Sequence, residues 1–415
     1  MFETIDSGIL KSLLPFLAPL LIPIVFYAFR RVYLAFQALH LLEDARKTVA
    51  QTARDGRMVE GPGFWLKKPI LQPANYAQLR GSIPVLMIAA TKGGVGKTSL
   101  TSSLAAYFAT KWTAQRQHSG ADEPLRVLVI DQDFQGSFTT MTTHLNNRGS
   151  LPSKANRLVS GDLGNGGVFQ QAEAITQDGM IPLPSIKTIP ADYDLAQAEN
   201  RKLIEWLLPL SDQGFLTWLL RTFKIRDPEL KSKNADIRYL LAEALLDRSV
   251  QTNFDLVIID APPRLTTSHI QAMCASTHLL IPTVLDALSG DAVYRYLDQI
   301  ATHKLGAVGD DSRIICPHLE PIGVVCTIIP AGGVNLDGAL NVLRQRIAAG
   351  RLKPEIVPND CFIKQRAPYR EHAGLRIAYA AESRNQAHND LRDEVDCLGD
   401  WVSPRLGARG WKRKP

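Results

Sequence analysis

A glycine-rich segment in the first quarter of the chain carries the residue types that bind phosphate. Residues 91–99 read Thr-Lys-Gly-Gly-Val-Gly-Lys-Thr-Ser. Glycines let the backbone turn tightly enough for several N–H groups to face one anion, and the positive end of a following helix adds to the attraction. The lysine of Gly-Lys-Thr would contact the β- and γ-phosphates, and the threonine hydroxyl would bind Mg²⁺. The residues expected around a nucleoside triphosphate are Lys92, Gly93, Gly94, Val95, Gly96, Lys97, Thr98 and Ser99.

The segments on either side have the patterns that a phosphate-binding loop requires. Val85–Ala90 is a nearly continuous apolar run, as expected for a parallel strand buried on both faces. After the loop, apolar side chains recur every four residues, which predicts a helix with one stripe packed on a sheet. These side chains are Leu100, Leu104, Phe108 and Trp112. The order of strand, loop and helix argues against a glycine turn that binds no nucleotide.

One position of the loop departs from the common pattern. That pattern has a glycine five residues before the glycine of Gly-Lys, where this chain has Thr91. An additional lysine, Lys92, precedes the glycine pair. A second lysine beside the phosphates needs a role of its own.

Carboxylates follow two other apolar runs, at the points where strands are expected to end. Val127–Ile130 leads into Asp131 and Asp133, and Leu256–Ile259 leads into Asp260. In an open α/β sheet, ligand sites gather at the carboxyl ends of the strands, so we expect these aspartates to face the phosphate-binding loop. Asp260 would hold Mg²⁺, directly or through water, opposite the threonine of the loop. The alternative is that the aspartates only end strands and begin turns.

Taken in order, these motifs resemble those of the ParA/MinD ATPases. The likeness rests on Lys-Gly-Gly-Val-Gly-Lys-Thr, on Asp-x-Asp-x-Gln-Gly, on Ile-Pro-Ala at 189–191 followed by Leu195 and Glu199, and on Ile-Ile-Asp-Ala-Pro-Pro. It extends from about Pro84 to about Tyr379. The strand-like runs 279–283 and 322–325 are part of it. The resemblance implies an α/β fold of the P-loop NTPase kind, a mostly parallel central sheet flanked by helices.

The resemblance also implies roles for individual residues. Lys92 would reach across a dimer to the partner's nucleotide, Asp133 would position the attacking water, and Asp131 would support the Mg²⁺ shell. The catalytic residues would then be Lys92, Lys97 and Asp133, the metal residues Thr98, Asp131 and Asp260, and the lining of the adenine pocket Pro358, Asn359 and Asp360.

Several positions differ from the family pattern. Phe134 stands where proline is common, Ser137 where asparagine is frequent, and Ser99 where a second threonine is usual. Residues 141–185 and 203–246 are longer than a minimal member needs, and we take them as elaborations.

The N-terminus has the character of a membrane anchor. From Leu13 to Phe29 the chain carries no charge, and counting back to Ile9 gives nearly the roughly 20 residues that cross a bilayer. Arg30 and Arg31 follow directly, and basic flanks stay on the cytoplasmic side. We therefore expect an N-terminal transmembrane helix in the bacterial inner membrane, with the ATPase domain in the cytoplasm.

The sequence leaves three alternatives to a spanning helix. Prolines spaced four residues apart, at Pro15, Pro19 and Pro23, favour a re-entrant or interfacial segment. A buried or oligomerisation helix is the second alternative. A cleaved signal peptide would have its basic residues before the apolar core, the reverse of the order here.

Composition and length give the domain division and exclude one class of relative. The 415 residues are divided into an anchor (1–31), a juxtamembrane helix and linker (32–80), an ATPase domain (81–400) and a basic tail (401–415). The five cysteines include no Cys-x-x-Cys pair, so we expect reduced structural thiols and no iron–sulfur centre. They are Cys274, Cys316, Cys326, Cys361 and Cys397.

The formal net charge of +6 leaves nonspecific DNA binding open. The tail after Asp400 has basic residues and no acidic one; it is either solvated or a contact to anionic lipid or DNA. The family's partitioning members bind DNA through basic patches. A patch here would consist of Lys364, Arg366, Arg370, Arg376 and Arg384.

The leading hypothesis is a membrane-anchored ParA/MinD-like ATPase that binds ATP and Mg²⁺, forms an ATP-dependent homodimer and positions or recruits a protein partner. One alternative is a membrane-linked bacterial protein-tyrosine kinase on a related fold. Against it, no tyrosine lies after Tyr379, where such kinases carry a tyrosine cluster. The other alternative is a nucleotide-gated scaffold with negligible hydrolysis, which Phe134 beside Asp133 would favour.

Overall fold

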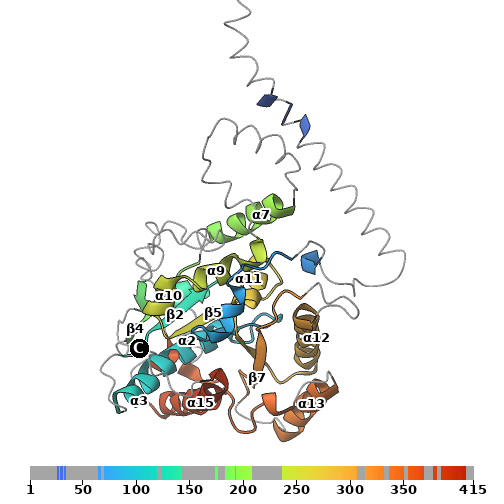
Figure 1. Cartoon of the computed structure of the whole chain (residues 1–415). Helices are drawn as coiled ribbons and strands as arrows, with labels where there is room; N and C mark the ends of the chain where they lie inside the picture. Colours follow the sequence, from blue (N-terminus) through green and yellow to red (C-terminus); the bar gives the residue numbers. More distant parts are fainter. Residues whose placement is uncertain are drawn as a thin grey trace, which may run out of the picture. The chain divides into compact units, whose positions relative to one another are not determined.

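The structure is a computed structural model of the chain (Figure 1). It describes residues 26, 27, 29, 30, 32, 33, 64–66, 70–118, 124–142, 173–175, 183–191, 193–207, 236–305, 314–330, 336–349, 354–368, 377–380 and 385–407. The chain divides into two compact units, Met1–Gly63 with Leu207–Lys224, and Phe64–Trp206 with Ile225–Pro415. The second unit contains every element discussed below.

A seven-stranded sheet forms the centre of this unit, in the order β3-β4-β2-β5-β1-β6-β7. All neighbouring strands are parallel except β3 and β4, so the predicted mostly parallel sheet is confirmed. The sequence patterns located five of the strands and missed β3 and β4 at the edge. The strands are β1 (Val85–Ile88), β2 (Val127–Asp131), β3 (Glu173–Ile175), β4 (Leu183–Ile189), β5 (Leu256–Asp260), β6 (His278–Thr283) and β7 (Glu320–Cys326).

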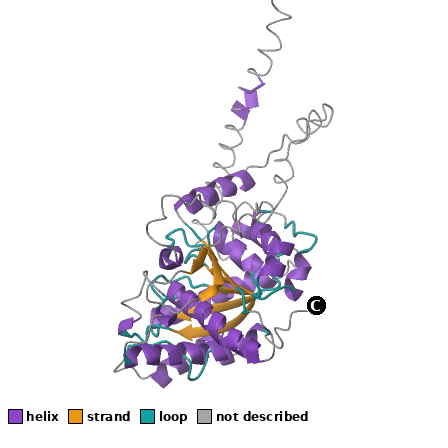
Figure 2. Ribbon diagram, turned by 90° about the vertical axis from the view of Figure 1, so that its left-hand side faces the viewer, coloured by secondary structure: helices purple, strands orange, loops and turns teal. Residues whose placement is uncertain are grey.

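Helices cover both faces of the sheet (Figure 2). Alternate side chains of each strand enter different apolar clusters: Leu128 and Ile130 join the cluster with α9, α11, α12 and α13, while Val127 and Val129 join the one with α2 and α15. The helices are α2 (Lys97–Tyr107), α3 (Thr113–His118), α4 (Ser137–Thr142), α7 (Tyr193–Leu207), α9 (Leu240–Leu245), α10 (Arg248–Asn253), α11 (Thr267–Ala275), α12 (Ala287–Leu305), α13 (Leu336–Ala349) and α15 (Gln386–Val402).

Short helical turns complete the unit. Two of them, η1 and η2, lie in the segment that the sequence assigned to the linker, yet Leu66, Tyr76 and Leu79 are buried in the core. The turns are η1 (Phe64–Leu66), η2 (Tyr76–Gly81), η3 (Phe108–Trp112, a π turn that continues α2), η7 (Ile237–Tyr239), η9 (Pro354–Ile356), η10 (Ala378–Ala380) and η11 (Ser403–Leu406).

The helix after the phosphate-binding loop packs as predicted. All four positions of its apolar stripe, from Leu100 to Trp112, are buried. Besides the sheet, α2 packs against α15. The two helices approach so closely that a Cβ on Gly399 of α15 would stand 2.3–2.4 Å from ring atoms of Tyr107 of α2. The Tyr107 hydroxyl also donates to the Asp400 carboxylate, and the Trp112 indole donates to the Ser403 hydroxyl at 3.0 Å. Helices α2 and α15 therefore form one rigid layer.

The cysteine prediction is confirmed for three residues and wrong for two. Cys274, Cys316 and Cys326 are free and buried. Cys361 and Cys397 form a disulfide, with Cα atoms 5.6 Å apart. Composition alone could not show that these two residues, 36 apart in sequence, come together.

Several predictions fall on residues that the structure does not describe. The predicted span, residues 9–29, lies outside the described residues apart from Phe26, Tyr27 and Phe29. None of the helices that the structure does describe has the length and apolar character that crossing a bilayer requires. The basic residues at 409–415 and most of the elaborations 141–185 and 203–246 also lie outside.

Candidate nucleotide-binding site

The predicted phosphate-binding loop connects β1 to α2, as the sequence required. Gly94 and Gly96 have φ angles of +73° and +74°, in the left-handed region that favours glycine. Gly96 is the residue immediately before α2, and the backbone N–H of Leu100 donates to its carbonyl at 2.9 Å. The first N–H groups of α2 are therefore directed toward the loop, where they attract an anion.

The aspartates that end β2 and β5 lie side by side. These strands are adjacent and parallel, and Asp131 is in register with Asp260. Both carboxylates lie on the sheet face that packs against α2. The Thr101 hydroxyl of α2 donates to Asp260 Oδ1 at 3.4 Å, and the Thr98 hydroxyl lowers the pKa of Asp260. The second oxygen of Asp260, Oδ2, is buried and has no hydrogen-bond partner among the described residues.

Asp131 is held differently, because both of its oxygens accept hydrogen bonds from the protein. Oδ1 accepts from the backbone N–H of Asp133 at 3.1 Å. Oδ2 accepts from the N–H and the hydroxyl of Thr139, at 2.9 and 2.8 Å. The Thr139 hydroxyl in turn accepts from the N–H of Ala191 at 2.8 Å. Asp131 thus joins the turn after β2 to α4 and to the end of β4.

Burial of two neighbouring carboxylates makes their ionisation costly. Desolvation raises the pKa of Asp131, and the charge of Asp133 adds to the rise. Desolvation and the charge of Asp131 raise the pKa of Asp260 more strongly. Burial lowers the pKa of the Lys97 ammonium, and Asp260 and Asp133 act against that effect. A divalent cation would relieve the repulsion and bind the unpaired Oδ2, and hydroxyl and carboxylate oxygens are the ligands that Mg²⁺ prefers. The residues present therefore fit the predicted metal.

Asp133 lies in the turn that follows β2 and is buried. Its Oδ1 accepts from the N–H of Gln135 at 3.1 Å, and its carbonyl accepts from the N–H of Gly136 at 2.8 Å. Gly136 has a φ of +60°. Phe134, between these residues, is 36% exposed. The aspartate is thereby fixed next to an exposed aromatic ring.

Glu199, noted in the sequence only as part of a motif, is a buried carboxylate of this region. It accepts from the N–H of Ser268 at 2.5 Å and from the hydroxyl of Thr266 at 3.1 Å, at the beginning of α11. Desolvation raises its pKa, and the charge of Asp133 adds to the rise. Sequence reasoning could not reveal this role, because the Ser268 N–H is contributed by a residue 69 positions away.

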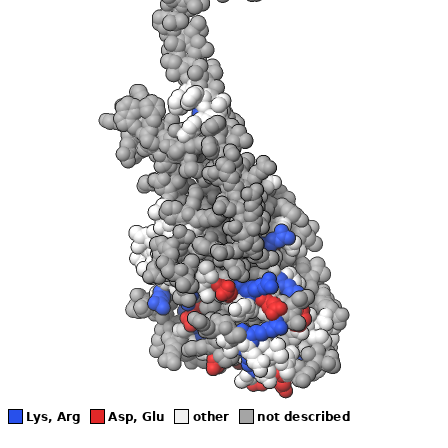
Figure 3. All heavy atoms as spheres, turned by 90° about the vertical axis from the view of Figure 1, so that its right-hand side faces the viewer, with Lys and Arg blue, Asp and Glu red and all other residues white. Residues whose placement is uncertain are grey.

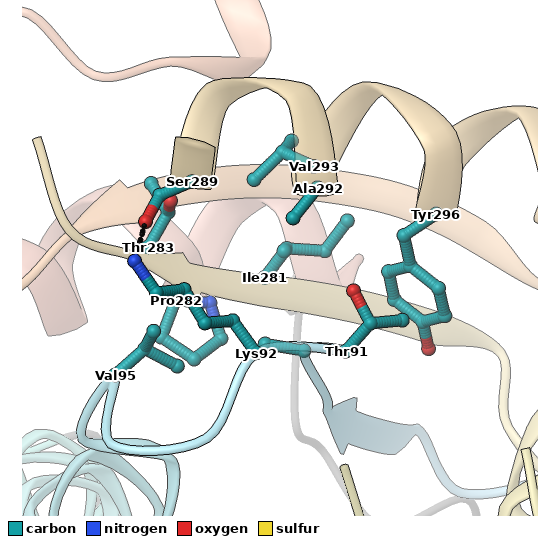
Figure 4. A pocket seen from close by; sticks show the side chains of 11 residues that line it. Thr91, Lys92, Val95, Ile281, Pro282, Thr283, Ser289, Ala292, Val293 and Tyr296 are labelled. Atoms are coloured by element: carbon teal, nitrogen blue, oxygen red, sulfur yellow. Dashed lines mark hydrogen bonds between the residues drawn. The ribbon is translucent and has the colours of Figure 1, made fainter. Parts of the chain in front are cut away.

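The additional lysine of the loop is bound within its own chain. Lys92 Nζ lies 2.7 Å from Oδ2 of Asp286 and 2.7 Å from Oγ of Ser289. Figure 4 shows the lysine extending from the loop to the beginning of α12, with Thr283 and Tyr296 lining the same small pocket. The hydrogen bond from Lys92 lowers the pKa of Asp286 to about 2. Neither Asp286 nor Ser289 belongs to a motif that the sequence could have flagged.

The three residues predicted to line the adenine pocket lie between η9 and the disulfide. Pro358 is buried, whereas Asn359 and Asp360 are exposed. An arginine that the sequence did not suggest, Arg344 of α13, donates to the Pro358 carbonyl at 3.2 Å and to Asn359 Oδ1 at 2.8 Å. No sequence pattern marks this contact, because the two segments are joined only in the fold.

Hydrogen bonds connect this segment to the loop. The N–H of Ile363 donates to the Cys326 carbonyl at 3.0 Å, and the hydroxyl of the next residue, Thr327, donates to the Val95 carbonyl at 2.7 Å. Ile328, which follows, has a φ of +55°, and its side chain lies beside Gly96. The structure thus connects the segment that follows the predicted adenine residues, through the end of β7, to the phosphate-binding loop.

Of the predicted basic patch, the structure describes Lys364 and Arg366. Arg366 is neutralised by ion pairs, and the Lys364 ammonium stands 5.7 Å from the centre of the Phe362 ring. The Arg366 guanidinium donates to Glu394 at 2.7 and 3.0 Å and to Asp390 at 2.7 Å. On the face shown in Figure 3, described basic and acidic side chains are interleaved. Arg370, Arg376 and Arg384 lie outside the described residues.

Comparisons with known proteins support the class of protein that the sequence motifs predict, a P-loop ATPase. A family model described as an AAA domain matches residues 222–306, which include β5 with Asp260. The chain is 24% identical over 251 residues to the chromosome-partitioning ATPase Soj of Thermus thermophilus, an alignment that covers 60% of this chain and 71% of the relative.

Two solved structures show partial similarity. Cobyrinic acid a,c-diamide synthase from Mycobacterium smegmatis, with a bound ATP analog and magnesium, is 23% identical; 64% of this chain and 82% of that chain are covered, with a TM-score of 0.43. The McdA–ATP complex of Cyanothece is 19% identical; 78% and 97% of the chains are covered, with a TM-score of 0.47. At TM-scores below 0.5, these likenesses do not assign a function to the chain.

Proposed function

We propose that the chain is a ParA/MinD-type ATPase that binds Mg²⁺ and ATP between β1 and α2. The observation that carries the proposal is the buried Oδ2 of Asp260, which has no partner in the part of the chain that the structure describes. It belongs to a carboxylate whose other oxygen accepts from the Thr101 hydroxyl and whose pKa the Thr98 hydroxyl lowers. A buried carboxylate oxygen without a partner is costly unless a cation binds it. The likeness to the partitioning ATPase Soj supports the same assignment.

Three residues would serve the metal. Thr98 and Asp260 would hold Mg²⁺, and Asp131, whose oxygens are engaged by Thr139 and the Asp133 N–H, would support the surrounding shell. Bound Mg²⁺ would neutralise part of the charge on the β- and γ-phosphates. Lys97, partly desolvated at the first position of α2, would attract the same phosphates strongly, because its charge is poorly screened there.

Hydrolysis would depend on Asp133. Its carboxylate is fixed by the N–H of Gln135, so it can orient a water molecule for in-line attack on the γ-phosphate. Lys92 would leave Asp286 and contact the nucleotide of a second copy of the chain. ATP would thus favour a dimer, and hydrolysis would return the monomer.

The cellular role proposed here is the positioning or recruitment of a partner from the inner membrane. Residues 9–29 would provide the anchor, and the ATP-dependent dimer would present the binding surface for a protein partner. The chromosome-partitioning function in the printed name of Soj supports a positioning role. Nonspecific DNA remains a candidate ligand, but it would need basic residues other than Arg366.

Two substitutions in the full chain, purified in detergent, test this proposal. Lys97→Ala should weaken binding of a fluorescent ATP analogue at least about tenfold, because the phosphates lose a desolvated cation. Asp133→Ala should bind the analogue within about threefold of wild type, release phosphate at least about tenfold more slowly and accumulate the ATP-bound dimer in sedimentation. The controls are Lys111→Ala, at an exposed position of η3, and Asp298→Asn, at an exposed position of α12.

For each variant, the opposite result would contradict one specific part of the proposed function. Nucleotide binding by Lys97→Ala at wild-type strength would remove the proposed site. Hydrolysis by Asp133→Ala at the wild-type rate would remove only the role of that aspartate. Transfer of radiolabel from ATP to the protein would favour the tyrosine-kinase alternative over hydrolysis.

A further inference from the structure

We propose that the disulfide between Cys361 and Cys397 is a redox-controlled tether that holds the adenine-binding segment in place, so that oxidation strengthens nucleotide binding. The inference rests on the proposed function and concerns the regulation of the same site. Cys361 directly follows Asp360, the last of the three residues proposed to line the adenine pocket. Its partner lies on α15, and the Cys397 Sγ is 4.0 Å from the Asp360 carbonyl oxygen.

The helix at the other end of the tether is fixed to the phosphate side of the site. Gly399, two residues after Cys397, allows α15 to contact the Tyr107 ring of α2. The Tyr107 hydroxyl bonds the Asp400 carboxylate on the same turn. Because α2 begins at Lys97, the disulfide connects the segment for the base to the layer that carries the residues for the phosphates. It therefore restricts the distance between the two halves of one nucleotide site.

Other contacts also hold the adenine-binding segment, but they involve residues that follow Cys361 in the sequence. Arg366 forms ion pairs with Asp390 and Glu394 of α15, and the N–H of Lys364 donates to Glu394 at 3.0 Å. Ion pairs at a partly exposed surface contribute little and are screened by salt. Without the disulfide, residues 358–360 would rely on these contacts, on Arg344 and on the backbone hydrogen bonds of Ile363 that follow them. Binding would then include the cost of ordering the segment.

Thiol–disulfide exchange is expected only at Cys361 and Cys397. Cys397 is partly exposed, so its thiolate can attack one sulfur of glutathione disulfide and release one glutathione thiolate. The Cys361 thiolate then attacks the mixed disulfide and releases the second glutathione. Two thiols of the protein are oxidised and one glutathione disulfide is reduced to two thiols. Burial raises the pKa of the free cysteines Cys274, Cys316 and Cys326, which keeps them unreactive.

The test compares the full chain after equilibration with glutathione disulfide and after reduction with dithiothreitol. Mass spectrometry with a thiol label should count three free thiols in the oxidised form and five in the reduced form. The dissociation constant of a fluorescent ATP analogue should be about threefold to tenfold lower in the oxidised form. This difference should increase at high salt, because the reduced form depends more on the Arg366 ion pairs than the oxidised form does.

Two variants make the result specific. Cys397→Ser should bind nucleotide like reduced wild type under both conditions, whereas Cys316→Ala, which changes a cysteine outside the tether, should keep the full redox difference. Five free thiols after oxidation, or equal affinity in the two redox forms of wild type, would overturn the tether. If the two redox forms of wild type bind the analogue equally well and Lys97→Ala binds it more weakly, the proposed ATPase site is supported and only the tether is contradicted. Absence of nucleotide binding in both forms would overturn the two proposals together.

Discussion

The ammonium of Lys92 lies 2.7 Å from the Oδ2 of Asp286, within a single chain. The two side chains are 37% and 44% exposed, so solvent screens their attraction. Exposed ion pairs of this kind contribute about 0–1 kcal/mol. If Lys92 serves the nucleotide of a second copy, as we propose, the contact with Asp286 competes with dimer formation but does not prevent it.

Asp286→Asn should therefore favour the ATP-bound dimer. The expected effect is a decrease of up to about fivefold in the protein concentration at which half the chains are dimeric, measured by sedimentation with ATP and Mg²⁺. Asp291→Asn is a matched control, because it breaks an exposed ion pair between α12 and Arg346 of α13 and leaves Lys92 untouched. Weaker dimerisation in Asp286→Asn than in the control would mean that Asp286 supports the dimer.

The parts of the site that the sequence predicted are those encoded within continuous segments. Apolar runs that end in Asp131 or Asp260 mark buried parallel strands, and the glycine pattern before Lys97 marks the loop. Each of these signals depends on neighbours within a few residues. The contacts that the sequence could not predict join distant segments: Lys92 with Asp286, for example, spans 194 positions.

The cysteine prediction failed for a related reason. Spacing rules detect cysteines that are close in sequence, and a cysteine pattern typical of a reducing compartment argued for free thiols. Cys361 and Cys397 meet because α15 folds back against the segment that follows β7, which depends on the packing of Gly399 against Tyr107. The sequence does not predict β3 and β4, because neither segment contains a continuous apolar run like that of β2.

The paired aspartates should make stability depend on pH. Burial and the neighbouring Asp131 raise the pKa of Asp260 from 3.8 to about 8 in the folded chain. Between these two values the folded state holds a proton that the unfolded state has released, so the free energy of unfolding falls as pH rises. One such proton changes it by at most about 1.4 kcal/mol per pH unit.

Asp260→Asn removes this titration. Without Mg²⁺ and nucleotide, the stability of the variant relative to wild type should increase from pH 5 to pH 8, as measured by denaturant unfolding. Asp298→Asn, which changes an exposed aspartate of α12, should show no such trend. A relative stability that decreases with pH in this window would contradict the assignment of a raised pKa to Asp260.

A buried histidine gives the opposite pH dependence. His269 Nδ1 lies 2.8 Å from the Pro262 carbonyl oxygen, and Nε2 lies 2.8 Å from the Tyr296 hydroxyl. Burial lowers its pKa from 6.5 to about 4. As pH falls from 6.5 towards 4, the unfolded state binds a proton that the folded state refuses, so the contribution of His269 to stability is lost.

His269→Gln should therefore cost more stability at pH 8 than at pH 5 in the same unfolding assay. At pH 8 the substitution removes two buried hydrogen bonds, each worth about 1 kcal/mol. Replacing the exposed His118 by Gln should give an equal, small effect at both pH values. A loss that is larger at pH 5 would show that the folded chain accepts the proton on His269.

Arg238 and Asp236 form a buried ion pair within the second unit. Arg238 is fully buried; its Nε donates to Asp236 Oδ1 at 2.8 Å, its Nη1 donates to the Trp65 carbonyl at 2.6 Å, and its guanidinium stands 5.2 Å from the centre of the Trp206 ring. The rings of Trp65 and Trp206 are stacked, with centroids 5.9 Å apart. Trp65 follows Phe64, the first residue of the second unit, and Trp206 is the last residue before the chain enters the first unit again.

Arg238→Met should destabilise the chain by about 3–5 kcal/mol, because it leaves the Asp236 carboxylate buried without its cation. The double variant Arg238→Met with Asp236→Leu should recover part of that loss, since no charge then remains unpaired. Arg346→Met, which removes one partner of an exposed pair, should cost less than about 1 kcal/mol. Equal losses for Arg238→Met and Arg346→Met in urea unfolding would show that burial adds nothing to the strength of the Arg238 pair.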